Sequence, residues 1–223
     1  GDPTRVVGYG SYAFWEPEQP SRVYDDTQRR VLIDLARASI EDGLARGAGA
    51  HGEIAAMRLD LSDAPAWQRS LAATFVTLKR PRGRLRGCIG TLRAHQALAQ
   101  DVVDHAFAAA FRDPRFPPLQ SAEVHGLDLH LSVLSAPEPF PVTNEADACA
   151  RLRPGVDGVL LSGGKDVLAR HRATFLPQVW DSLPEPEAFL RALKQKAGLA
   201  PDHWPVALQT YTVEEWHDEP SPA

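Results

Sequence analysis

Residues 73–91 read ATFVTLKRPRGRLRGCIGT, and the turn residues Pro81-Arg82-Gly83 stand near the middle of this stretch. The run before the turn predicts a strand over residues 73–79. The run after it predicts an antiparallel partner over residues 84–92, so that the whole stretch forms a β-hairpin. A hairpin of this length places an antiparallel sheet at the centre of the expected fold.

Period-two alternation predicts which side chains of the second hairpin strand share a face. It places Arg84, Arg86 and Cys88 on one face and Leu85 and Ile89 on the other. Two guanidinium groups beside a thiol favour the thiolate and attract anionic ligands. Cys88 is therefore a candidate nucleophile, and Arg84 and Arg86 are candidates for binding an anionic substrate. The alternative is a small cysteine buried in a strand.

Two glycines flank the cysteine and belong to the same candidate site. Gly87 and Gly90 leave room for a ligand or for another backbone to approach closely. The alternative reading is a bulge or tight packing within the sheet.

The rest of the chain mixes helical and strand patterns. Asp25 or Asp26 can cap a helix that Gly47 ends. Further helices are predicted from residue 98 to the Asp113-Pro114 pair, over residues 145–152, and from Pro186 to Gly198. Strands or extended segments are predicted over residues 54–61, 127–133, 156–162, 174–179 and 206–216. Because the elements lack a regular βαβ rhythm, the expected fold is α+β with a mainly antiparallel sheet.

Composition limits the classes of protein that remain. The chain has 223 residues, 43% of them hydrophobic, enough for one large domain or two small lobes. No run approaches the roughly 18 apolar residues of a membrane-spanning helix, and no signal peptide is recognisable. Its two cysteines form neither a disulfide framework nor a cysteine-based metal site. We therefore expect a cytoplasmic protein with no metal, cofactor or membrane partner.

Charge argues against nucleic acid as a general partner. The formal net charge is −5, although residues 79–93 carry six basic residues and no acidic one. This basic segment also lacks the aromatic side chains on which bases stack. A small anionic ligand suits it better than RNA.

Other polar residues are weaker candidates. Gln178 follows a proline in an apolar run and is a candidate substrate-binding amide, or it satisfies backbone groups. Asp113 and Arg115 are expected to pair and fix the helix exit. Asp128 and His130 share the wet face of a strand, which is too little for a metal site.

Several segments, in this order, resemble motifs of the AMMECR domain family: Leu85-Arg86-Gly87-Cys88-Ile89-Gly90-Thr91, Asp113-Pro114-Arg115-Phe116, Leu131-Ser132-Val133-Leu134, Phe175-Leu176-Pro177-Gln178-Val179, and Lys196-Ala197-Gly198-Leu199 followed by Trp204. The resemblance covers most of residues 25–216. It implies an α+β fold with two sub-lobes around a cleft, with the Arg-Gly-Cys segment in or near that cleft. The chain departs from the pattern at Asp157, where many members carry histidine. The family offers no settled reaction.

The N-terminus carries a second resemblance. Residues 5–14, RVVGYGSYAF, are similar to the closing strand of Memo-type domains. This likeness implies a Memo–AMMECR fusion, and an ordinary N-terminal strand is the alternative. Domains similar to these two occur with a radical S-adenosylmethionine protein in the AmmeMemoRadiSam set, so Memo-like and radical S-adenosylmethionine proteins are the implied partners. The expected organisation is an N-terminal strand and linker over residues 1–22, an AMMECR-type domain over 23–217 and a frayed tail over 218–223.

Two functions remain open at this point. The domain is either an accessory or substrate-binding component that acts with those partners, or a thiol-dependent enzyme. In the second case Cys88 is the nucleophile, Arg86 binds the anionic group of the substrate, and a general base is still required. His95 is the nearest histidine in sequence.

Overall fold

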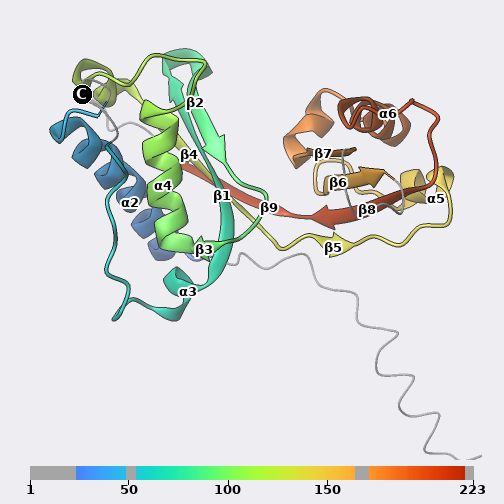
Figure 1. Ribbon diagram of the computed structural model, residues 1–223, viewed down its shortest axis with the longest axis horizontal. Helices are drawn as coiled ribbons and strands as arrows, with labels where there is room; N and C mark the ends of the chain where they lie inside the picture. Colours follow the sequence, from blue (N-terminus) through green and yellow to red (C-terminus); the bar gives the residue numbers. More distant parts are fainter. Residues whose placement is uncertain (1–23, 49–53, 164–170, 219–223) are drawn as a thin grey trace, which may run out of the picture.

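The computed structural model describes residues 24–48, 54–163 and 171–218, which form two lobes, each built on its own antiparallel sheet (Figure 1). The predicted α+β class with antiparallel sheets is confirmed. The N-terminal strand and linker, the possible Memo-like remnant and most of the C-terminal tail lie outside the described residues.

The first lobe is a sheet covered by helices on one face (Figure 1). Its strands run in the order β2 (Arg84–Gly90), β1 (Leu71–Arg80), β4 (Asp128–Leu134) and β9 (Val213–Asp218), and the short β3 (Gln96–Ala97) pairs with the start of β1. Its helices are α2 (Asp26–Ala45), α3 (Ala66–Arg69) and α4 (Leu98–Phe111), and the 3-10 helices η1 (Pro81–Gly83) and η2 (Ser121–Gly126) complete it.

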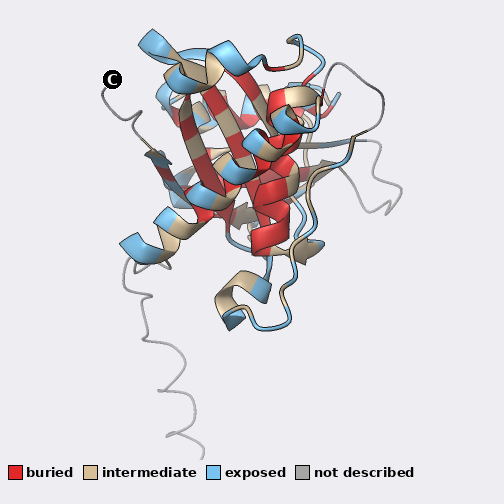
Figure 2. Cartoon of the chain, turned by 90° about the vertical axis from the view of Figure 1, so that its left-hand side faces the viewer, coloured by how far each residue is buried: buried red, intermediate tan, exposed pale blue. Residues whose placement is uncertain are grey.

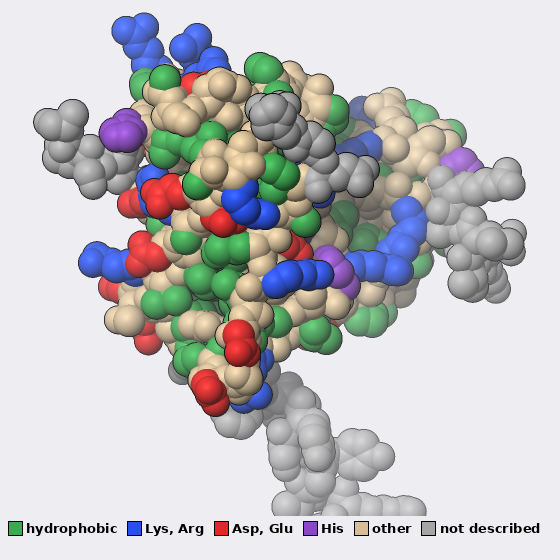
Figure 3. Space-filling model, turned by 60° about the vertical axis from the view of Figure 1, so that its left-hand side comes forward, with side chains coloured by type: hydrophobic (Ala, Val, Ile, Leu, Met, Phe, Trp, Pro, Cys, Tyr) green, Lys and Arg blue, Asp and Glu red, His purple; other side chains and the backbone are tan. Residues whose placement is uncertain are grey.

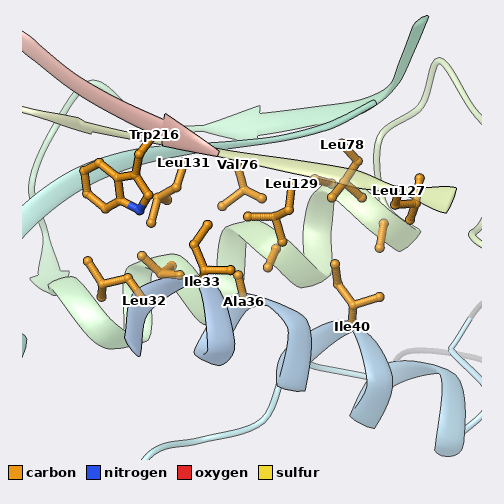
Figure 4. Packing of buried hydrophobic residues seen from close by; sticks show 14 of the residues in the cluster. Leu32, Ile33, Ala36, Ile40, Val76, Leu78, Leu127, Leu129, Leu131 and Trp216 are labelled. Atoms are coloured by element: carbon orange, nitrogen blue, oxygen red, sulfur yellow. The ribbon is translucent and has the colours of Figure 1, made fainter. Parts of the chain in front are cut away.

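The main core lies between α2, α4 and this sheet (Figure 4). Ile33 and Ala36 of α2 point toward Val76 and Leu131 of the sheet, and all of these side chains are nearly or fully buried. Figure 2 shows the same division, with buried residues gathered between helices and strands. Val76 faces the helices, and successive side chains of a strand point to opposite faces, so the residues directly before and after Val76 in β1 face away from the helices.

The predicted signals at the ends of α2 are confirmed. The Asp25 side chain accepts a hydrogen bond from the Gln28 N–H, and the Gln28 side chain accepts one from the Asp25 N–H, which completes a capping box. Gly47, with φ of 75°, follows the helix in the left-handed region that glycine adopts without strain.

The second lobe has its own core. Its sheet runs in the order β5 (Glu138–Pro139), β8 (Val206–Tyr211), β6 (Gly158–Gly163) and β7 (Arg172–Phe175), with α5 (Glu145–Arg151), α6 (Pro186–Lys196) and the 3-10 helix η3 (Pro177–Asp181). Trp180 of η3 stacks on Phe189 of α6 with ring centroids 3.7 Å apart. Both side chains are buried in this second cluster.

The chain passes between the lobes twice, from β4 to β5 and from β8 to β9. The predicted single strand over residues 206–216 is two strands, β8 in one sheet and β9 in the other. The break falls at Thr212, whose N–H donates to Ser135 Oγ while its carbonyl accepts from the Ser135 N–H. A shared apolar cluster that includes Leu134, Leu160 and Tyr211 packs the lobes together.

One predicted strand is absent. Residues 54–61 form no strand, and the side chain of Gln100 binds their backbone instead. Its Nε2 donates to the Met57 carbonyl at 3.0 Å, and its Oε1 accepts from the Leu59 N–H at 3.0 Å. Residues 174–179 are extended only in part, because η3 begins at Pro177.

Candidate functional site

A β-bulge changes the face on which the residues of β2 lie. Leu78 pairs with Gly87 and Lys79 with Leu85, so Arg86 is the extra residue on β2. The predicted common face for Arg86 and Cys88 is therefore wrong, because the extra residue interrupts the alternation. Arg84 lies exposed at the hairpin end.

Arg86 is buried on the helix side of the sheet, with 1% of its surface exposed. Its Nε and Nη2 donate to the two carboxylate oxygens of Glu123 at 2.9 and 3.0 Å, and Nη2 also donates to the Pro117 carbonyl at 3.0 Å. Arg80 binds the same carboxylate. The hydrogen bond from Arg86 is the main cause that lowers the pKa of Glu123 to about 2. This ion pair fixes the hairpin to η2.

The backbone of Cys88 is held from outside the hairpin. The Asp113 carboxylate accepts the Cys88 N–H at 2.8 Å, and Arg115 donates to the Cys88 carbonyl at 3.0 Å. The predicted Asp113–Arg115 pair is present, with Nη2 and Oδ2 2.6 Å apart. The hydrogen bond from Arg115 holds the pKa of Asp113 well below its ordinary value. These two side chains cover the outer edge of β2 and fix the position of the cysteine.

Both glycines lie where another part of the protein approaches closely. A Cβ on Gly87 would lie 2.0 Å from the Ala109 carbonyl oxygen of α4. A Cβ on Gly90 would lie 2.3 Å from the Phe75 ring. Gly87 thus permits close packing of α4 on the hairpin, and Gly90 makes room for Phe75.

Four side chains form a row across the sheet on the face away from the helices. Thr77 pairs with Cys88 of β2 on one side and with His130 of β4 on the other, and His130 pairs in turn with His217 of β9. The Thr77 Oγ1 donates to the Cys88 Sγ at 3.1 Å. The two imidazole rings stack with centroids 5.1 Å apart. This row places a thiol, a hydroxyl and an imidazole on neighbouring strands of one sheet face, and the thiol and the hydroxyl are in hydrogen-bond contact.

His130 also has an acidic neighbour that reaches the second lobe. Its Nδ1 lies 3.6 Å from a carboxylate oxygen of Glu215. The amide of Gln178, in η3, donates to the other oxygen of Glu215. Burial and the positive charge of Lys79 lower the pKa of His130, whereas Glu215 opposes this shift. A lowered pKa favours the neutral imidazole, which is the form that can accept a proton.

His95, the histidine nearest to Cys88 in sequence, lies outside this row. His95 lies instead near Asp101 of α4, with Nδ1 3.9 Å from Oδ1. The alternation of residues 127–133 correctly placed His130 on the less buried strand face. Its pairing with Thr77 depends on the register between two strands distant in the chain, so the sequence did not indicate it. Among the described residues, no three His, Cys, Asp or Glu side chains are grouped to hold a metal ion.

A hollow of about 450 Å³ separates the lobes beside this row. Phe75 and Gly90 line it from the first lobe, and Leu160 and Thr174 line it from the second. Phe75 and Gly90 form a cross-strand pair two residues along the strands from the pair Thr77 and Cys88, so both pairs lie on the same face of the sheet. Figure 3 shows basic side chains along the depression between the main body and the smaller lobe.

None of the helices in the described part of the chain combines the length and the apolar character that crossing a membrane requires.

The comparisons with known proteins agree with one another. The AMMECR1 family model matches residues 33–216. A protein of Methanothermobacter thermautotrophicus is 38% identical over 178 residues, covering 78% of this chain and 83% of that protein. A protein of Saccharolobus solfataricus is 36% identical over 185 residues, covering 78% and 73%. The crystal structure of the uncharacterized protein PH0010 from Pyrococcus horikoshii has a TM-score of 0.68 at 29% identity, covering 85% of this chain and 90% of that one. The chain belongs to the AMMECR1 family.

Proposed function

We propose that this AMMECR1-family domain is a thiol-dependent enzyme in which Cys88 is the nucleophile and His130 the general base. The observation that carries this proposal is the cross-strand row in which Thr77 stands between them, with its hydroxyl 3.1 Å from the sulfur. A nucleophile, a base and an acidic group that orients the base are the parts that nucleophilic catalysis requires. Glu215 supplies the third part.

The step that this arrangement supports is substitution at an electrophilic carbon. In the structure the Thr77 hydroxyl donates to Cys88 Sγ, so for the reaction it turns to accept the Cys88 proton on Oγ1 while its own proton passes to His130 on the neighbouring strand. The sulfur then forms a bond to the carbon as the bond to the leaving group breaks. His130 returns the proton to the leaving group, and water or a second substrate later releases the group held on sulfur. Arg115 and Asp113 hold the Cys88 backbone throughout.

The test is the rate at which iodoacetamide alkylates Cys88 at pH 7. The protein carries Cys149→Ser, which leaves one thiol. We expect modification of the folded protein, slowed at least about tenfold by Thr77→Val and by His130→Gln, because each removes part of the proton path. Arg84→Gln is the matched control on the same hairpin. The proposal is refuted if Cys88 reacts only when the protein unfolds, or if His130→Gln leaves the alkylation rate unchanged.

A second function has its own supporting observation, the exposed end of the hairpin. Arg82 and Arg84 are exposed there and have no carboxylate partner among the described residues, and Leu85 is 41% exposed beside them. This end lies at the top of Figure 3, where basic side chains project. Such a surface suits an acidic protein partner. In this function the domain is an accessory component that docks a Memo-like or radical S-adenosylmethionine protein.

Titration calorimetry with a Memo-like protein separates the two functions. The accessory function predicts binding that Arg82→Glu together with Arg84→Glu abolishes and that Cys88→Ser leaves intact. If the two charge reversals leave the binding unchanged, the accessory function is refuted.

A further inference from the structure

The hollow between the lobes has apolar walls. Its sides include Phe75 and Leu92 from the first lobe and Leu160 and Ala173 from the second. Its volume of about 450 Å³ lies within the range of roughly 300–1,000 Å³ that small-molecule sites occupy. An apolar body of the size of a phenyl ring or a short branched chain would remove these walls from water.

Two arginines stand at this hollow, one from each lobe. Arg93 follows β2, and Arg172 begins β7. Neither guanidinium has a carboxylate partner within the ranges that the structure describes, unlike Arg80 and Arg86, which share Glu123. An unpaired guanidinium is a good site for a carboxylate or a phosphate.

The local backbone holds Arg93 in place. Its N–H donates to Thr91 Oγ1 at 3.2 Å, and its carbonyl lies 3.2 Å from the Nδ1 of His95. Arg172 pairs with Ser162 in the sheet of the second lobe. Both cations therefore project from fixed backbone, which reduces the entropy lost when an anion binds.

The hollow is also close to the proposed nucleophile. Gly90 lines it and lies two residues along β2 from Cys88, on the same face. Two residues of strand span roughly 7 Å. A ligand held by the arginines could extend its other end to the thiol.

We infer that the inter-lobe hollow binds a small anion with an apolar body, a carboxylate or a phosphate ester, whose charge lies between Arg93 and Arg172. The inference rests on the proposed thiol enzyme only in naming this ligand as its substrate. The ligand contacts both lobes, so its binding holds them together.

The experiment is titration calorimetry with three probes. The first, 3-phenylpropionate, has an apolar body and a carboxylate. The second, 3-phenylpropan-1-ol, has the same body without the charge, and inorganic phosphate has the charge without the body. We expect 3-phenylpropionate to bind saturably with a dissociation constant below about 10 mM. The other two probes should bind at least about tenfold more weakly, since one lacks the charge and the other lacks the apolar body.

Variants assign the binding to this hollow. Arg93→Gln and Arg172→Gln should each weaken the binding of 3-phenylpropionate about tenfold, and Arg191→Gln, an exposed change on α6, should leave it unchanged. Ala173→Leu, which narrows the hollow without touching a charge, should also weaken it. Because both arginines are exposed, their variants should unfold within about 2 °C of the parent protein, which separates lost binding from lost folding.

Three results would overturn the inference: no saturation with 3-phenylpropionate, equal binding of the acid and the alcohol, or affinity that both arginine variants leave unchanged. The failure of the proposed chemistry is distinguishable from these. Cys88→Ser should bind 3-phenylpropionate as the parent does. If 3-phenylpropionate binds normally but the thiol is inert, the proposed enzyme is refuted and the binding site in the hollow is supported.

Discussion

Replacing Arg86 with methionine should destabilise the fold strongly, although arginine is usually a surface residue. The side chain is 1% exposed and makes three hydrogen bonds, two to the Glu123 carboxylate and one to the Pro117 carbonyl. Its guanidinium also lies 5.9 Å from the centroid of the Phe116 ring. Methionine retains much of the apolar volume but none of the donors.

The size of the effect follows from what remains after the change. Breaking a buried ion pair by removing one partner costs about 3–5 kcal/mol. In this case Arg80 still binds Glu123, whose side chain is 24% exposed, so that Arg80 and water compensate for part of the loss. The Pro117 carbonyl loses its donor, which costs about 1–3 kcal/mol if the group stays dry. We expect a net loss of about 3 kcal/mol, or about 6–12 °C in the melting temperature of a protein of this size.

Urea unfolding followed by circular dichroism measures this loss. Arg86→Lys should fall between the parent and Arg86→Met, because lysine restores the charge but not the forked geometry. Arg84→Gln, an exposed change on the same strand, should stay within about 0.5 kcal/mol of the parent. If Arg86→Met unfolds at the parent's urea concentration, the buried pair does not hold the hairpin to η2 and the reasoning is refuted.

Three further predictions concern stability. Because the pKa of Glu123 is lowered from 4.5 to about 2, its stabilising effect is complete above about pH 4.5 and is lost as the pH falls toward 2; the stability difference between the parent and Glu123→Gln should shrink over that window, and a constant difference would contradict it. Gly87→Ala places a Cβ 2.0 Å from the Ala109 carbonyl and should cost about 1–3 kcal/mol or more in urea unfolding, whereas an unchanged midpoint would refute the close approach. Lys194 is 1% exposed, and its Nζ lies 2.8 Å from Oε1 of Glu145. Glu145→Ala should therefore lower the free energy of unfolding by up to about 3 kcal/mol, because it leaves a buried ammonium without a partner, whereas Lys194→Met should lower it by about 1 kcal/mol or less. Equal losses in the two variants would contradict this asymmetry.

Local sequence patterns predicted most of the elements because their causes are local. The Asp25 cap and the positive φ of Gly47 depend on a few neighbouring residues, and so does the turn at residues 81–83. The alternation in residues 127–133 identified β4 and its buried face. Where a pattern required a partner strand, it was less reliable. Residues 54–61 have strand character, but the Gln100 side chain binds their backbone, and they form no strand.

The candidate site was predicted only in part, because its geometry depends on contacts between distant residues. The sequence alone identified Cys88, the basic hairpin and the two glycines as unusual. Only the tertiary structure placed Arg86 in a bulge against Glu123, 37 residues away, and thereby on a different face from the cysteine.

The sequence by itself determined the family, the α+β class and the hairpin that carries the thiol, since these follow from motifs and short-range periodicity. The tertiary structure alone decided that residues 206–216 divide between two sheets. It also decided that His130 stands in the same row as Cys88. Strand register and lobe packing bring together residues that are far apart in the chain, and no local pattern encodes which of them will meet.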